Sequence, residues 1–162
     1  MGERAVAHDD LRGLSTTAQI GGHPLHPMLI PLPIGLLVAT FVCDLVFWST
    51  QDQFWASAAF WALAGAIVTA LIAAIAGFMD FFGNSRIRAI KDAWRHMVGN
   101  LVAVVLAVLS LWMRSINGSD FILPWGLLIS TIVVALILYT GWKGGELSYR
   151  HRVGMLPDDR GH

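Results

Sequence analysis

The sequence predicts an all-α integral membrane protein: a four-transmembrane-helix bundle that runs up, down, up and down, with both termini in the cytoplasm. Three observations predict this fold. Of the 162 residues, 56% are apolar and only 14% are charged, whereas a soluble domain carries about 25% charged residues. The mean hydropathy is +0.61. Long apolar stretches alternate with polar segments, and the basic residues lie on one side of them.

The chain begins with a polar segment of mixed charge, residues 1–20. A secretory signal peptide needs a positive start followed at once by an apolar core, and this segment has neither. We therefore expect a partly disordered cytoplasmic tail, then a membrane domain over residues 21–151. Residues 152–162 form a second polar tail.

Four apolar stretches set the expected helices at 28–49, 54–79, 97–113 and 121–142. A helix needs about 20 apolar residues to cross a bilayer core about 30 Å thick, and three stretches reach that length. The third is shorter, but the charged side chains at its edges can extend to the interface. In the second stretch, small residues recur every fourth position at Gly65, Thr69, Ala73 and Gly77, and such a stripe lets two helices approach closely.

The basic residues orient the bundle. With four crossings, ten of the eleven Lys and Arg residues fall on one side: two before the first helix, four between the second and third, and four after the last. The other side has only Arg114. Because positive residues are retained in the cytoplasm, we expect a multi-pass protein of the bacterial inner membrane with both ends inside. The basic 80–95 link is expected to lie along the inner surface.

Two His-Pro steps, at His23 and His26, stand before the first predicted helix. A residue before proline is pushed out of the α region, so we expect both histidines in a stiff extended segment, with regular helix from about Pro31. Further potential ligands are expected on the same cytoplasmic face: Asp80, His96 with Asn100 one turn further in, Glu146 and His151.

If the helix ends converge, these side chains form one polar layer. Imidazole and carboxylate ligands together suit zinc, iron, manganese or nickel, whereas two imidazoles facing each other suit a b-type haem. His26 and His96 are the preferred ligands, followed by His23 and His151. Asp80 and Glu146 would be metal ligands or would orient the ligands. The alternative is that these residues only cap helices or bind lipid headgroups, without any cofactor.

One acid, Asp44, lies deep in the first predicted helix. A charged carboxylate at the centre of a membrane helix costs roughly 2.5–3.5 kcal/mol, so its side chain should face the bundle interior. It is either a proton or cation relay or a hydrogen-bonded structural acid.

The segments Gly22-His-Pro-Leu-His-Pro-Met28 and Ile30-Pro-Leu-Pro-Ile-Gly35 resemble the start of a bacterial family of inner-membrane proteins known as a domain of unknown function. The resemblance covers about residues 20–155 and continues at Asp80, His96 and residues 141–151. It implies a four-helix membrane module without an assigned activity. The family is similar, distantly, to membrane b-type cytochromes, and related chains occur beside redox domains. By analogy this favours a haem or another redox metal.

The leading hypothesis is therefore a haem- or metal-binding module for electron transfer, with a redox partner or a larger membrane complex. Two other classes stay open: a small proton-coupled carrier that uses Asp44, and an accessory or structural subunit. An enzyme is less expected, because no phosphate loop and no nucleophile–base pair is present. Besides the lipid bilayer, a second copy of the chain is a possible partner. Nucleic acid is not, because the formal net charge is zero.

Overall fold

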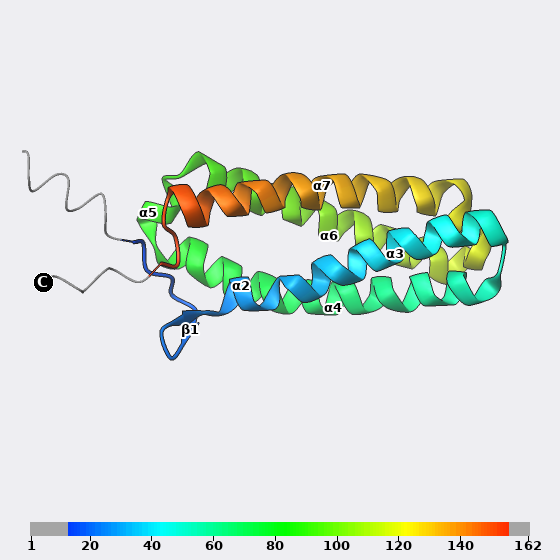
Figure 1. The fold of residues 1–162 in the computed structure, drawn as a ribbon, viewed down its shortest axis with the longest axis horizontal. Helices are drawn as coiled ribbons and strands as arrows, with labels where there is room; N and C mark the ends of the chain where they lie inside the picture. Colours follow the sequence, from blue (N-terminus) through cyan, green and yellow to red (C-terminus); the bar gives the residue numbers. More distant parts are fainter. Residues whose placement is uncertain (1–12, 156–162) are drawn as a thin grey trace, which may run out of the picture.

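The computed structural model describes residues 13–155, and over this range the chain is an elongated helical bundle (Figure 1). Its body consists of α3 (Pro31–Thr50), α4 (Gln53–Gly83), α6 (Lys91–Asn117) and α7 (Leu127–Gly145). α3 packs mainly against α4, and α6 mainly against α7. The shorter elements are β1 (Gln19–Ile20), β2 (His23–Pro24), α2 (Leu25–Leu29), α5 (Ser85–Arg88), η1 (Gly118–Phe121), η2 (Ile122–Gly126) and η3 (Glu146–Arg150). We call the two ends of the bundle the α5 end and the η1 end.

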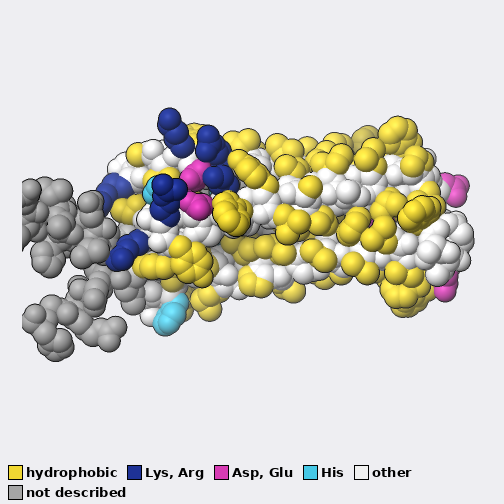
Figure 2. All heavy atoms as spheres, turned by 45° about the horizontal axis from the view of Figure 1, so that its top comes forward, with side chains coloured by type: hydrophobic (Ala, Val, Ile, Leu, Met, Phe, Trp, Pro, Cys, Tyr) yellow, Lys and Arg dark blue, Asp and Glu magenta, His cyan; other side chains and the backbone are white. Residues whose placement is uncertain are grey.

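Three helical stretches are long and apolar enough to cross a membrane: Leu25–Thr50, Gln53–Gly83 and Lys91–Arg150, the last of which contains both α6 and α7. In their most apolar windows, only 22%, 22% and 28% of the residues are buried inside the protein. Most apolar side chains therefore point outward and give a continuous apolar surface (Figure 2), which is far larger than the patches that soluble proteins expose. The structure confirms an all-α membrane protein.

The helix boundaries follow local signals. Proline is tolerated in the first turn of a helix, and α3 begins at Pro31, as expected. It ends at Gln51, whose backbone is left-handed, and the Asp52 side chain then accepts a hydrogen bond of 2.9 Å from the amide of Phe54. This N-cap satisfies one of the free amides at the start of α4, so two residues suffice to reverse the chain.

All four long helices differ from their expected bounds, and the largest shifts are at the starts of α6 and α7. α6 spans 27 residues rather than 97–113, because its first turns are polar and continue the helix beyond the apolar stretch. α7 begins at Leu127 rather than at 121, because Leu123 has an extended backbone before Pro124, as proline demands of the residue before it. The link between α4 and α6 is only residues 84–90 with the single-turn α5, so it is not the long surface segment that 80–95 was expected to form.

The structure describes the polar N-terminal segment from residue 13 onward, and residues 1–12 lie outside the described range. Leu14 and Ala18 are buried, and Leu14 pairs with Val153 in a parallel bridge. The two ends of the described chain thus meet at the α5 end of the bundle. Residues 13–20 do not form a loose tail, because Leu14 packs in the hydrophobic cluster at this end of the bundle. The expectation of a partly disordered tail stays a prediction for the residues before them.

Exposed charged side chains lie at the two ends of the bundle on the face drawn in Figure 2. All described Lys and Arg residues except Arg114 belong to segments at the α5 end. The exposed acids Asp52 and Asp120 lie at the η1 end. Arg114 was expected beside the loop at that end, but it is only 4% exposed and lies inside the bundle. The asymmetry of accessible positive charge is therefore greater than the sequence alone indicated.

Candidate functional site

The first candidate side chain, His26, lies in the short helix α2 and points at α4. Its Nδ1 lies 2.8 Å from the carbonyl oxygen of Ala73. Gly77, one turn further along α4, leaves room for the ring: a Cβ there would lie 2.8 Å from the His26 Cε1. Two members of the small-residue stripe of α4, Gly65 and Gly77, therefore face α3 and α2. His26 itself is helical rather than extended, because Pro27 falls in the first turn of α2, where proline is tolerated.

The second candidate, His96, lies two turns into α6 and points at α7. Its Nδ1 lies 2.8 Å from the carbonyl oxygen of Thr140. Gly144 gives its ring room, since a Cβ there would lie 3.1 Å from the His96 Cε1. Each histidine thus has the same two neighbours on the helix it faces: a carbonyl that binds Nδ1 and a glycine four residues further on.

The two rings lie together in the interior of the α5 end. Their centroids are 6.1 Å apart and their planes are inclined by 87°. His26 belongs to the α3–α4 side of the bundle and His96 to the α6–α7 side. Because a carbonyl oxygen can only accept, each Nδ1 donates its hydrogen, which leaves Nε2 as the ring nitrogen that could bind a metal. The pair therefore offers two oriented nitrogen ligands.

A polar network surrounds His96. The amide nitrogen of Asn100 donates to the His96 carbonyl oxygen at 2.9 Å and lies 3.1 Å from its Nε2. The Asn100 side-chain oxygen accepts a hydrogen bond of 2.9 Å from the Thr140 hydroxyl. Sequence analysis placed Asn100 beside His96 but missed Thr140. α7 carries two threonines, Thr131 and Thr140, and the sequence does not show which of them faces α6.

The other predicted ligands do not join this pair. His23 is exposed on the β1–β2 hairpin, where its Nδ1 contacts the Gly21 carbonyl oxygen at 3.0 Å. Asp80 is buried and accepts a hydrogen bond of 2.7 Å from the amide of Ala18, which anchors the N-terminal segment. Within residues 13–155, no group of three or more His, Cys, Asp or Glu side chains is placed to hold a metal ion.

The remaining two candidates lie at the surface of the α5 end. Glu146 pairs with Arg150 at 3.3 Å. His151 lies 3.9 Å from Asp92, which also pairs with Lys143 at 3.1 Å. Asp92 was not singled out from the sequence, because an acid beside basic residues in a helical turn is common at membrane surfaces.

Asp44 faces the interior of the bundle, as expected from the free-energy cost of exposing a carboxylate to lipid. It is fully buried, and both of its oxygens accept hydrogen bonds from the Arg114 guanidinium, at 2.8 and 2.6 Å. The Arg114 Nε donates to the Ser110 hydroxyl at 3.2 Å. A bidentate pair of this kind fixes both side chains. The two charges are 70 residues apart in sequence, so the pairing was not visible before the fold.

An apolar bundle whose inward-facing polar side chains form small closed clusters defines a polytopic helical membrane protein. The chain belongs to the family described as predicted membrane protein (DUF2231), which matches residues 22–157. The family confirms the resemblance to a membrane domain of unknown function. No curated protein and no solved structure matches the chain. The similarity to b-type cytochromes stays a prediction.

Proposed function

We propose that this protein is a membrane electron-transfer module that binds a b-type haem through His26 and His96. The observation that carries the proposal is the pair of imidazoles from opposite sides of the bundle, each with its Nδ1 bound to a carbonyl. Histidines that ligate metals generally donate their other ring hydrogen in this way, which fixes the tautomer and the ring orientation.

The separation of the rings fits two ligands of one iron. An imidazole nitrogen bonds a metal at about 2.0–2.1 Å. With centroids 6.1 Å apart, both rings would be near enough to hold one iron. Gly77 and Gly144 let the two imidazoles lie directly against α4 and α7, because a Cβ at either position would lie within 3.1 Å of the facing ring.

A haem fits this donor set better than a bare divalent ion. Structural zinc sites use four protein ligands and catalytic ones three, and no such cluster exists among the described residues. A haem supplies most of its iron ligands itself, so His26 and His96 would suffice to hold it. When bound, it would supply reversible one-electron chemistry. The protein would hold the two rings through the carbonyls of Ala73 and Thr140, and Asn100 would have to release the Nε2 of His96.

We further propose that the chain crosses the bacterial inner membrane four times, with both ends in the cytoplasm. At 1.5 Å per residue, a helix of 20 residues is about 30 Å long, which matches a bilayer core. α3 has 20 residues and α7 has 19, while α4 and α6 are longer. The meeting of both described ends beside the accessible Lys and Arg residues supports this orientation.

The test is an absorption spectrum and a metal analysis of the full chain purified in mild detergent. We expect a Soret band that shifts on reduction, and its loss in His26→Ala and His96→Ala. His23→Ala is the matched control, because that histidine is exposed and contacts only its own turn. A Soret band that persists in both ligand variants, or a colourless wild-type protein, would contradict the proposal.

The proton-coupled carrier is the weaker candidate. A relay at Asp44 needs a polar path to one face, but an apolar layer separates the Asp44–Arg114 pair from the histidines. This layer contains Leu37, Leu63, Ala66, Ile67, Ala103, Ala107, Val133 and Ile137. An accessory subunit of a larger complex would instead purify without cofactor, so the same spectrum separates it from the haem proposal.

A further inference from the structure

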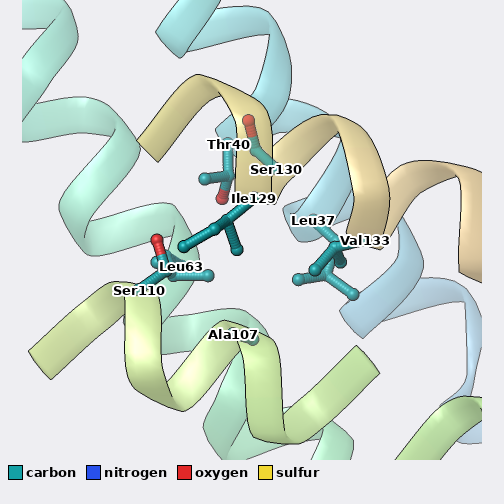
Figure 3. A pocket seen from close by; sticks show the side chains of 8 residues that line it. All are labelled: Leu37, Thr40, Leu63, Ala107, Ser110, Ile129, Ser130 and Val133. Carbon is teal, nitrogen blue, oxygen red and sulfur yellow. The ribbon is translucent and has the colours of Figure 1, made fainter. Parts of the chain in front are cut away.

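A small cavity lies inside the bundle, and Figure 3 shows the side chains that line it. It adjoins the Asp44–Arg114 pair, because the Ser110 hydroxyl in its lining accepts a hydrogen bond from the Arg114 Nε. It touches all four long helices, and its lining is apolar except for three hydroxyls: Thr40 from α3, Ser110 from α6 and Ser130 from α7. These three side chains are almost completely buried, at 2%, 2% and 5% exposure. The volume open to a water molecule is ≈ 10 Å³, and a site of about 10–15 Å³ holds one water.

The hydroxyls around the cavity retain unused hydrogen-bonding capacity. Thr40 donates to the Leu36 carbonyl at 2.8 Å and Ser130 to the Leu127 carbonyl at 3.1 Å, so each oxygen keeps lone pairs. Ser110 is used only as an acceptor, from the Arg114 Nε. Its hydroxyl hydrogen has no acceptor within the described part of the chain. A buried donor without a partner is costly, and the cavity is the space into which it can donate.

The Ser110 hydrogen requires an acceptor, and the oxygens of Thr40 and Ser130 can accept in addition. A sodium ion could not accept the Ser110 hydrogen, and it would lie close to the Arg114 guanidinium. A chloride could accept it, but a chloride is larger than the single water molecule that a volume of ≈ 10 Å³ admits. Water accepts from Ser110 and has two hydrogens to donate, which matches the two remaining oxygens.

From this accounting we infer that the cavity binds one ordered water molecule, which hydrogen-bonds Ser110 and bridges it to Thr40 and Ser130. The water ties α3, α6 and α7 together within the half of the membrane that holds the ion pair. It also sets the direction of the Ser110 hydroxyl, because donation to water leaves its oxygen lone pairs toward the Arg114 Nε. The site is independent of any haem.

The test is a structure of the full chain at a resolution that resolves ordered water. We expect one peak within hydrogen-bonding distance of Ser110 Oγ, which disappears in Ser110→Ala. Thr40→Val is the second variant and should weaken or displace the peak. Thr131→Val is the matched control, because that exposed threonine donates to the same Leu127 carbonyl at 2.7 Å but points away from the cavity.

An empty cavity at high resolution, or a peak that rubidium replaces with an anomalous signal, would overturn the inference.

Discussion

Removing the Asp44 carboxylate should destabilise the bundle, because it leaves the buried Arg114 guanidinium without its ion-pair partner. In Asp44→Ala the guanidinium of Arg114, whose side chain is only 2% exposed, would lose two of its three hydrogen-bond contacts and keep only Ser110. Leaving one member of a buried ion pair without its partner costs about 3–5 kcal/mol. We therefore expect the free energy of unfolding to fall by about 3 kcal/mol, roughly a hundredfold in the unfolding equilibrium.

The assay is reversible unfolding in mixed micelles with increasing denaturing detergent, followed by circular dichroism. Asp120→Ala is the control, because it removes an exposed acid at the same end of the bundle and should change stability by less than about 0.5 kcal/mol. The double variant Asp44→Leu with Arg114→Met should recover most of the loss, since apolar replacement of a whole buried pair is often neutral. A loss below about 1 kcal/mol in Asp44→Ala, or additive losses in the double variant, would refute the reasoning.

Two further predictions concern the histidine site and the topology. Gly77→Ala should reduce haem content, because the added Cβ would lie 2.8 Å from the His26 imidazole. Gly35→Ala is the control and should leave haem content unchanged, because the space around Gly35 is open. Equal haem content in the two variants would contradict the close approach of His26 to α4. In a Cys43→Ala background, Asn117→Cys should react with an impermeant thiol reagent on intact cells, and Ser85→Cys only after permeabilisation; the reverse pattern would contradict the proposed orientation.

The long helices were predictable from the sequence because a lipid bilayer permits few backbone conformations. A long apolar stretch must satisfy its own backbone hydrogen bonds, and a helix does so within one segment. The ends were less predictable, because polar turns such as Lys91–His96 continue a helix beyond the apolar stretch. The extended backbone at Leu123 was predictable from Pro124, because proline disfavours the α region for the residue before it.

The sequence predicted His26 and His96 as a pair, but it did not predict that the other four candidate ligands would lie apart from them. Sequence spacing places His26 and His96 at the same membrane face, but it does not fix the rotation of each helix about its axis. That rotation points His26 at Ala73 and His96 at Thr140, and it sends His151 toward Asp92 instead. His23 separates from the pair because the two glycines after Ile20, both with positive φ, form a tight hairpin.

Titration of the purified chain with hemin tests the central claim most directly, because it measures the capacity of the site regardless of loading during expression. We predict a Soret band that saturates at one hemin per chain in the wild type and in His23→Ala. The band should be absent or strongly weakened in His26→Ala and in His96→Ala, with the helical content of both variants unchanged. Saturation at one hemin per chain in both of those variants would show that the histidine pair is not the ligand.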